Sequence, residues 1–460
     1  MRIALGIVAS FALVSPCFAA AEGLVGRLLD KVACQADATQ LYALYVPSHY
    51  TPEKKWPVIF CFYLGARGRT PVERLQAAAE KYGYIVAGSL NSRNGPWAAN
   101  ATAIQAMVRD VESHLAIDVR RIYTAGMSGG ARVATQVAIG GLAKGVIACS
   151  AGFPSSEDGV PAKVPFVFFG TAGTEDFNHG ELCRLQSELE SRKATHRIVF
   201  FQGGHEWASS ALLTEAVEWF ELQAMKTGTR AKDEGFVAAQ WQARVAAMPV
   251  EDSPARWRAL KSLAADFKSL SDTAEMEKKV KDLGASRALK DALKAERQAQ
   301  QREDDLVLQL GELAGGGSSA RMRKLVAELR QKSSAPEDSA ERQMVRRVIG
   351  GFGSSGRDAT RSMFESGDYV EAAALLEMLL EFRPGQSRTL YDLARARAGA
   401  GDKKRALEAL QLAADAGLSD AARVEAETLF AKLRGEAAYQ AALTKIRENP
   451  PEPAGRGRNR

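Results

Sequence analysis

The sequence has 460 residues, of which 46% are hydrophobic and 25% are charged, as in an ordinary globular protein. This length allows two or three domains, with a core large enough to need no disulfide or metal for its stability. The net charge of +6 includes three arginines of the C-terminal tail, Arg456, Arg458 and Arg460. So small an excess predicts a solvated tail and argues against a nucleic-acid-binding groove.

The segment 1–21 has the pattern of a secretory signal peptide. Arg2 gives it a positive start, residues 3–14 are apolar but too few to span a bilayer, and small residues follow at positions 19–21. We therefore predict cleavage after Ala19 or Ala21 and a secreted or periplasmic protein. No later stretch is apolar enough to predict a membrane span.

Four cysteines follow the predicted cleavage site: Cys34, Cys61, Cys149 and Cys183. An even number of cysteines in an exported protein permits disulfides. Cys61 and Cys149 lie in apolar, strand-like runs, which are equally compatible with buried thiols, so both states remain open. No Cys/His spacing indicates zinc, and we expect neither a metal nor an organic cofactor.

Residues 22–228 predict a doubly wound α/β domain with a mostly parallel sheet, because short apolar β-type runs alternate with helical stretches. The later strands are continuous apolar runs, as expected when helices cover both faces of the sheet. The expected strands span 41–47, 56–64, 83–90, 120–127, 145–151, 164–170 and 196–203. The expected helices span 71–82, 98–116, 130–140, 181–193 and 208–226.

The strand pattern stops near residue 228, and an all-α region is expected beyond it. Residues 229–350 predict a charged helical linker region. Two glycine- and serine-rich stretches, 314–320 and 349–356, predict flexible breaks in it. Residues 448–460 predict a disordered basic tail.

Residues 351–447 contain a repeat with a period of 34. Gly367 and Gly401 are 34 positions apart, and so are the buried-type residues Leu376 and Leu410. The period and the Gly-Asp turn resemble tetratricopeptide repeats, in which helix pairs stack because no pair can bury its apolar face alone. The resemblance implies a possible protein partner bound by this region.

A candidate nucleophile lies in the frame Gly126-Met127-Ser128-Gly129-Gly130, which fits G-x-S-x-G. A serine hydroxyl needs a base to take its proton, and it must project away from its own backbone. The α/β hydrolases achieve this at a strained turn between a strand and a helix. Ser128 lies between an expected strand and an expected apolar helix, so the context predicts a catalytic serine.

The α/β-hydrolase fold requires the chain order serine, acid, histidine. Among the five histidines, His205 alone has the right place, in a glycine-rich loop between the last strand and the last helix. Three carboxylates compete for the acid role after the preceding strand: Glu175, Asp176 and Glu181. Glu181 suits the start of the next helix, where it favours the helix dipole. We choose Asp176 over Glu175 because a short carboxylate suits the orientation of an imidazole.

Oxyanion stabilisation needs two backbone N–H donors. We expect one from Gly129 and the other from Gly65 or Ala66, in the loop after the strand at 56–64. Substrate-binding candidates lie on the same carboxyl edge of the sheet, where ligands collect in open α/β sheets. They are Trp97, Asn94 and Arg67. The alternatives are that Trp97 packs at the start of its helix and that Arg67 is a surface cation of the loop.

The motifs "YTAGMSGGA", "GTAGTEDFN" and "GGHEW" resemble the exported esterase family that includes polyhydroxybutyrate depolymerases and feruloyl esterases. The resemblance covers about residues 40–225. It implies ester hydrolysis through an acyl-enzyme carried by Ser128, Asp176 and His205. The family's His-Gly-Cys type oxyanion sequence is replaced by Leu64-Gly65-Ala66-Arg67-Gly68, which leaves the substrate class open.

The sequence therefore predicts an exported serine hydrolase that acts on a small or polymer-linked carboxylic ester. Two alternatives remain. One is a serine peptidase of the same fold. The other is a catalytically idle hydrolase domain attached to a repeat-type interaction protein.

Overall fold

The computed structural model describes residues 25–95, 97–154, 159–315, 320–336 and 339–451. The predicted signal peptide and residues 452–460 of the predicted tail lie outside the described residues. The chain divides into two compact units. The sheet unit comprises the chain up to Thr171 with Glu181–Val199 and Trp207–Leu283, and the helical unit comprises Ala172–Gly180, Phe200–Glu206 and the chain from Gly284.

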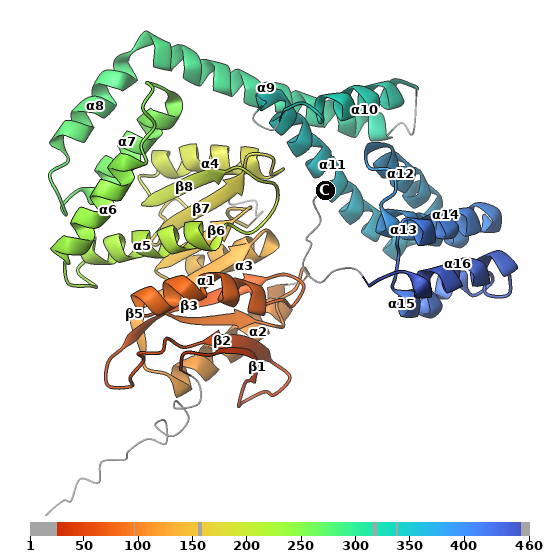
Figure 1. Ribbon diagram of the computed structural model, residues 1–460, viewed down its shortest axis with the longest axis horizontal. Helices are drawn as coiled ribbons and strands as arrows, with labels where there is room; N and C mark the ends of the chain where they lie inside the picture. Colours follow the sequence, from red (N-terminus) through yellow and green to blue (C-terminus); the bar gives the residue numbers. More distant parts are fainter. Residues whose placement is uncertain (1–24, 96, 155–158, 316–319, 337–338, 452–460) are drawn as a thin grey trace, which may run out of the picture. The chain divides into compact units, whose positions relative to one another are not determined.

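An eight-stranded sheet in the order β1-β2-β4-β3-β5-β6-β7-β8 confirms the predicted α/β-hydrolase fold (Figure 1). β2 is antiparallel to both of its neighbours, whereas β4, β3, β5, β6 and β7 run parallel. The strands are β1 (Leu28–Ala33), β2 (Leu41–Tyr45), β3 (Trp56–Tyr63), β4 (Ile85–Ser89), β5 (Ile117–Met127), β6 (Gly145–Cys149), β7 (Val167–Gly173) and β8 (His196–Phe201). Seven of these strands were predicted, and β1 was not.

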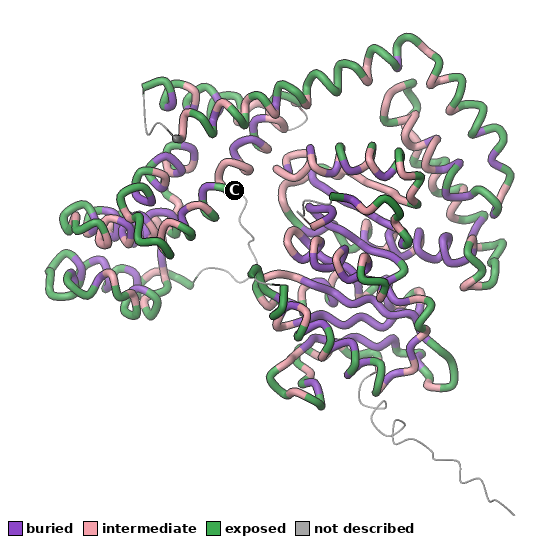
Figure 2. The backbone as a smooth tube through the Cα atoms, turned by 180° about the vertical axis from the view of Figure 1, so that it is seen from behind, coloured by how far each residue is buried: buried purple, intermediate pink, exposed green. Residues whose placement is uncertain are grey.

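β8 runs in the same direction as β7. The backbone N–H of Phe168 donates to Thr195, and that of Thr174 donates to Phe201, so that both strands advance together. The central strands are buried along their length (Figure 2). This burial explains their continuous apolar sequences, because strands with helices on both faces have no solvent-facing side.

Five helices alternate with these strands close to the predicted positions. They are α1 (Arg69–Tyr82), α2 (Trp97–His114), α3 (Gly129–Ile139), α4 (His179–Ser191) and α5 (Ser210–Lys226). Their ends follow local chemistry. α1 is capped at its C-terminus by Gly83, whose φ of 71° is left-handed, and α5 is capped at its N-terminus by Ser209, whose side chain accepts a hydrogen bond from the N–H of Leu212.

The sheet unit continues beyond the last strand through helices α6 (Glu234–Ala246), α7 (Pro254–Phe267) and α8 (Ala274–Ala285). An apolar cluster joins α5 to α6 and α7, including Leu222, Val237 and Phe267. Buried Asp266 accepts a hydrogen bond from the Trp219 indole at 2.7 Å and pairs with Arg244 at 2.6 Å. α6 and α7 are therefore fastened to α5 by apolar packing and by a buried polar network.

The helical unit holds the remaining helices, which confirms the predicted all-α region. They are α9 (Arg287–Gly315), α10 (Ala320–Lys332), α11 (Ala340–Ser366), α12 (Tyr369–Phe382), α13 (Ser387–Gly399), α14 (Lys403–Asp415), α15 (Ala421–Ala426), the 3₁₀ turn η2 (Thr428–Phe430) and α16 (Ala437–Glu448). Each helix from α11 to α14 packs on the next one, and α14 packs on α16.

The 34-residue spacing joins structurally equivalent positions. Gly367 and Gly401 both occupy left-handed turns, with φ of 84° and 83°. Leu376 on α12 and Leu410 on α14 are both buried in one apolar cluster. The membership of these helix pairs in the tetratricopeptide class stays a prediction.

The predicted flexible break at 349–356 is wrong, because α11 runs through it without interruption. Gly356 lies against Leu379 of α12, and a Cβ at this position would come within 2.8 Å of the leucine side chain. Gly350 and Gly351 lie against Phe177. Gly356 thus allows α11 to pack closely on α12. The other predicted break, 314–320, lies mostly outside the described residues, between α9 and α10.

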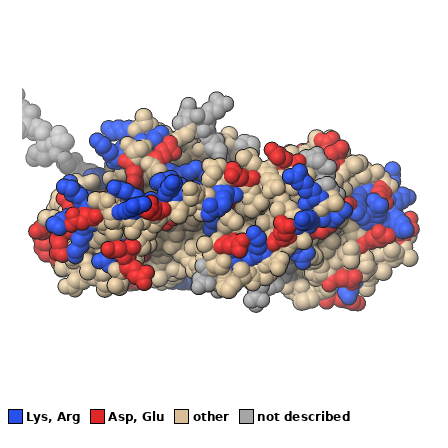
Figure 3. All heavy atoms as spheres, turned by 90° about the horizontal axis from the view of Figure 1, so that it is seen from above, with Lys and Arg blue, Asp and Glu red and all other residues tan. Residues whose placement is uncertain are grey.

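Basic and acidic side chains are interspersed on the face drawn in Figure 3. Cys34, Cys61 and Cys149 are buried thiols, and burial raises the pKa of Cys34 to about 11. None of the helices in the described part of the chain has the length and apolar content needed to cross a membrane.

Candidate active site

Ser128 lies at the turn between β5 and α3, as the motif predicted. Its φ of 58° and ψ of −126° are unusual for a residue with a side chain. Such a conformation costs about 1–3 kcal/mol and persists only where its surroundings hold it in place. Its N–H donates to the carbonyl of Cys149 at the end of β6, at 2.8 Å, and its own carbonyl accepts from Ala131 in α3 at 2.9 Å. The backbone therefore fixes a strained, half-buried serine at the end of a buried strand.

Three glycines allow this turn to form. A Cβ at Gly126 would overlap the backbone of Gly130, and a Cβ at Gly130 would overlap the carbonyl of Phe62 in β3. A Cβ at Gly129 would overlap the side chain of Leu64. The G-x-S-x-G frame is thus required by the close approach of three backbone segments.

The predicted oxyanion loop lies next to Gly129. Gly65 has φ of 116° and Ala66 has φ of 59°, so two successive residues are in left-handed conformations. The N–H of Ala66 donates to the carbonyl of Ser92 at 3.2 Å. Gly65 is therefore the better of the two candidates for an oxyanion donor, since the Ala66 N–H has a partner within the protein.

The three substrate-binding candidates have different surroundings. Asn94 lies beside the Ser128 turn, since a Cβ at Gly129 would be 2.7 Å from its Oδ1. The exposed Arg67 stacks on the ring of Tyr63 at 4.5 Å and donates to the Tyr63 hydroxyl at 3.1 Å. Trp97 begins α2 and is 47% exposed, so packing does not explain its large apolar side chain. Asn94 is thus the one candidate whose contact places it beside the serine's turn.

Asp176 and His205 are brought together in the helical unit. Asp176 Oδ1 lies 2.8 Å from His205 Nδ1 and also accepts the backbone N–H of Asn178 at 2.8 Å. Asp176 is fully buried, and its Oδ2 has no hydrogen-bond partner among the described residues. Since a carboxylate can only accept, Nδ1–H of His205 is the donor in this contact.

The two competing carboxylates have other partners. Glu175 is mostly buried and lies 3.2 Å from both Arg342 and Arg346. Glu181, at the start of α4, pairs with Arg132 at 2.6 Å and accepts the N–H of Gly152 at 2.9 Å. Of the three acids, Asp176 is the one that contacts the histidine.

The loops that carry Asp176 and His205 are packed against each other. The N–H of Glu175 donates to Gly203 at 2.8 Å, and a Cβ at Gly173 would overlap the carbonyls of Gly203 and Gly204. The ring of Phe177 stacks on His205 with a centroid distance of 4.0 Å. Sequence reasoning missed this contact, although the aromatic residue directly after Asp176 was a signal for it.

Trp207 in the sheet unit is a second residue that the sequence analysis did not assign. It is 5% exposed and meets the ring of Tyr63 edge to face at 5.7 Å. Its indole nitrogen is buried without a hydrogen-bond partner among the described residues. Trp207 and Arg67 thus both contact Tyr63, next to the predicted oxyanion loop.

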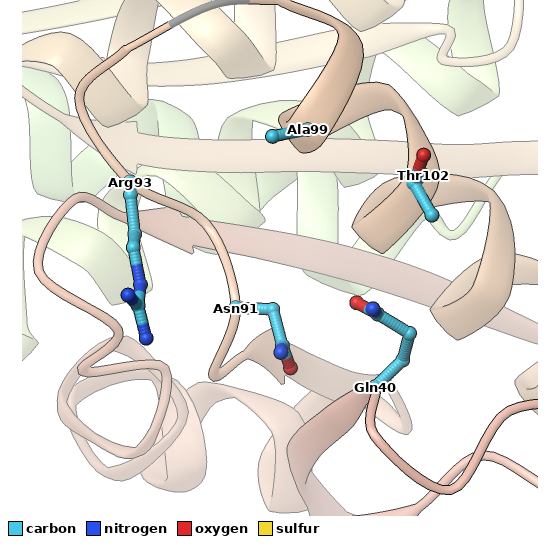
Figure 4. Close-up of a pocket in the computed structure, with 5 residues that line it drawn as sticks. All are labelled: Gln40, Asn91, Arg93, Ala99 and Thr102. Atoms are coloured by element: carbon cyan, nitrogen blue, oxygen red, sulfur yellow. The ribbon is translucent and has the colours of Figure 1, made fainter.

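An open cavity of about 420 Å³ lies beside the loop that carries Asn94 (Figure 4). It is lined by Gln40, Asn91, Arg93, Ala99 and Thr102. Asn91 has a structural task there, because it accepts the N–H of Leu41 at 2.7 Å and donates to Thr39 at 3.1 Å. Within the described residues, no group of three His, Cys, Asp or Glu side chains is placed to hold a metal ion.

No protein-family model matches the sequence, and no curated protein matches it. Solved structures with a similar fold include the esterase Est1E of Butyrivibrio proteoclasticus, with 16% identity over 43% of this chain and 98% of that chain and a TM-score of 0.33. A hyperthermophilic esterase of Pyrobaculum calidifontis has 14% identity over 45% and 87% of the two chains and a TM-score of 0.35. A fluorophosphonate-binding serine hydrolase of Staphylococcus aureus has 13% identity over 39% and 91% and a TM-score of 0.32.

Proposed function

We propose that this protein is a serine hydrolase that cleaves carboxylic esters through an acyl-enzyme on Ser128. The observation that carries the proposal is the backbone of Ser128, a non-glycine residue at φ 58° between a buried strand and a helix. Nothing in the packing of an ordinary glycine-rich loop calls for a side chain in this conformation. Exposure of a nucleophile does call for it.

The Asp176–His205 pair supplies the second half of the proposed chemistry. With Nδ1–H donated to Asp176, His205 Nε2 takes the Ser128 proton as the oxygen attacks the ester carbonyl. The tetrahedral intermediate then collapses, and His205 returns the proton to the leaving alcohol. Water repeats the sequence on the acyl-enzyme and releases the acid. The backbone N–H groups of Gly129 and Gly65 are the proposed donors to the oxyanion.

The sheet topology supports this assignment. β5, β6, β7 and β8 are successive neighbours that run in one direction. Ser128 follows the carboxyl end of β5, Asp176 that of β7 and His205 that of β8. Ligand and catalytic sites of open α/β sheets are built at this edge.

A fluorophosphonate probe tests the proposal directly. We expect it to label wild-type protein on Ser128 and to leave Ser128→Ala unlabelled, with the fold of the variant retained. Ser150, which also has positive φ and follows the next strand, offers a control as Ser150→Ala, which should keep the label. Absence of labelling in folded wild type would favour the idle-domain alternative.

The type of bond cleaved is a separate question. We expect turnover of p-nitrophenyl esters to exceed that of aminoacyl anilides by a wide margin, because the alkoxide or phenoxide of an ester is a better leaving group than the amine of an amide. The reverse preference would make the chain a peptidase of the same fold.

Export and a partner of the repeats belong to the same proposal. We expect the mature chain to begin after Ala19 or Ala21, which N-terminal sequencing of material from the periplasm or medium would test. The repeat pairs from α11 to α16 are the proposed surface for a protein partner, as the resemblance to tetratricopeptide repeats implies.

A further inference from the structure

Helix α11 of the helical unit contacts the loop that carries Asp176 at several consecutive positions. The first contact is ionic. Arg342 Nε lies 3.2 Å from Glu175 Oε1, and Arg346 Nη1 donates to Glu175 Oε2 at 3.2 Å. The side chains of Arg342 and Glu175 are 14% and 13% exposed, so solvent screens this pair only weakly. The residue directly before Asp176 is therefore held by two guanidinium groups of α11.

The second contact is made by Arg347. Its Nη1 donates to the backbone carbonyl of Thr174 at 2.6 Å. Its Nε and Nη2 form a bidentate pair with the buried carboxylate of Glu303 on α9, with distances of 2.9 and 2.6 Å. A bidentate pair fixes the plane of a guanidinium, so Glu303 holds Arg347 in the position that reaches Thr174.

The third contact is apolar. Phe177 lies against Gly350 and Gly351, where an added Cβ would come within 3.4 to 3.7 Å of its side-chain atoms. The Phe177 ring also stacks on the imidazole of His205, with a centroid distance of 4.0 Å. α11 thus packs against Phe177, whose ring stacks on His205, the proposed catalytic base.

These contacts enclose Asp176 from both sides along the chain, at Thr174 and Glu175 before it and at Phe177 after it. A loop that follows a strand is usually held by its own turn and by its neighbours in the sheet. This loop is in addition held by residues about 170 positions later in the chain.

We propose that Arg347, with Arg342 and Arg346, positions the Asp176–His205 pair, so that the C-terminal helices are a working part of the hydrolase. The inference rests on the proposed function for its kinetic consequence. The three arginines contact Thr174 and Glu175 of the loop. They act through the loop, and the same geometry predicts that any event that moves α11 changes the rate of the chemical step.

The test is Arg347→Met in the full-length protein, with Arg361→Met as the matched control. Arg361 lies on the same helix and forms an exposed pair with Asp358. We expect Arg347→Met to lower kcat by about 10- to 100-fold with KM unchanged, since small misplacements of catalytic groups have effects of this size. Arg347→Lys, which can keep one hydrogen bond but not the bidentate pair, should recover only part of the loss. Arg361→Met should match wild type.

Two further measurements keep the inference open to refutation. Glu175→Gln keeps the shape of the loop and removes the charge that Arg342 and Arg346 bind, so it serves if Arg347→Met does not fold. The low-field proton resonance of His205 Nδ1–H, assigned by its loss in His205→Asn, reports the pair without turnover. We expect this resonance to broaden or shift in Arg347→Met and Glu175→Gln and to stay unchanged in Arg361→Met.

The outcomes separate this inference from the proposed function. Unchanged kcat and an unchanged resonance in folded Arg347→Met and Glu175→Gln would overturn the positioning role. A wild-type protein that neither hydrolyses esters nor reacts with the fluorophosphonate, yet loses the resonance in Arg347→Met, would refute the proposed function and leave the positioning role standing.

Discussion

The Ser128 turn and the pair of loops that carry Asp176 and His205 are held in different ways. At Ser128 the main chain holds the turn. It forms backbone hydrogen bonds to β6 and α3, and glycines allow neighbouring carbonyls to approach closely. At Asp176 and His205 the backbone contacts between the two loops are supplemented by side chains, namely arginines of α11 and the ring of Phe177. The first arrangement uses the neighbouring strands β3 and β6 together with α3, whereas the second depends in addition on a helix about 170 positions later in the chain.

This difference has a physical consequence. Backbone overlap is repulsive over tenths of an ångström, so the Ser128 turn either forms fully or does not form. Ion pairs and ring contacts are softer, because side chains can turn and water can replace a lost partner. Variants at the glycines of the turn should therefore affect folding and activity together, whereas variants around the loops should change activity at nearly constant stability.

Asp176→Asn should produce the largest change in activity. An amide at this position can donate to Nδ1, which places the imidazole proton on Nε2 and removes the base. We expect kcat to fall about 10³- to 10⁴-fold. Asp358→Asn, at an exposed carboxylate of α11, should leave kcat unchanged. Steady-state kinetics on an activated ester would measure both, and retention of more than a tenth of the wild-type kcat in Asp176→Asn would argue against its role.

Gly126→Ala should produce the largest loss of stability. Its Cβ would overlap the backbone of Gly130, and neither segment can turn away as a side chain would. We expect unfolding free energy to fall by about 3 kcal/mol or more, with loss of activity. Gly140, at the end of α3, has a negative φ, and an added Cβ would have no contact closer than 3.4 Å. The change Gly140→Ala should therefore be nearly neutral. Denaturant unfolding of both variants tests whether the turn is as rigid as this argument requires.

The same contrast explains what sequence reasoning could reach. The strands from β2 to β8 and the Ser128 turn follow from patterns within a few residues, namely apolar runs and a glycine-serine frame. β1 was missed because its sequence, LLDKVA, places charges in mid-strand. The stretch 349–356 was misjudged because its glycines serve contacts with Phe177 and Leu379, which no local pattern reveals. The contact of Arg347 with Thr174 joins residues 173 positions apart and has no sequence signal.

Acid should act on the second region and spare the first. His179, three residues after Asp176, has its pKa lowered to about 4 by burial and by the nearby Arg347 guanidinium. The unfolded chain binds a proton at His179 more readily than the folded chain does. The free energy of unfolding is therefore at its full value above about pH 6.5 and decreases as pH falls toward 4. Between pH 7 and pH 5 we expect a loss of about 2 kcal/mol from this group. His179→Gln should remove that part of the pH dependence in denaturant unfolding, and an unchanged slope would show that His179 is not the group responsible.

The smallest effect that we expect comes from a pair of variants on α11. The pair distinguishes a loss of the contact with Phe177 from a general destabilisation of the helix. Gly350→Leu adds a side chain where α11 meets Phe177, while Gly353→Leu adds the same side chain on the same helix near the end of Arg357. Both changes raise helix propensity by about 1 kcal/mol, so neither should destabilise α11 through its backbone. Only the first displaces the ring that stacks on His205.

We therefore expect kcat to fall about 10-fold in Gly350→Leu, with KM and thermal stability close to wild type, and no kinetic change in Gly353→Leu. Equal losses in both variants would mean that α11 as a whole tolerates no added bulk, and the contact with Phe177 would then have no special part. A loss of kcat confined to Gly350→Leu would mean that α11 holds the His205 imidazole in place through its contact with the Phe177 ring. A soft, distant support of this kind could limit the rate while leaving the fold intact.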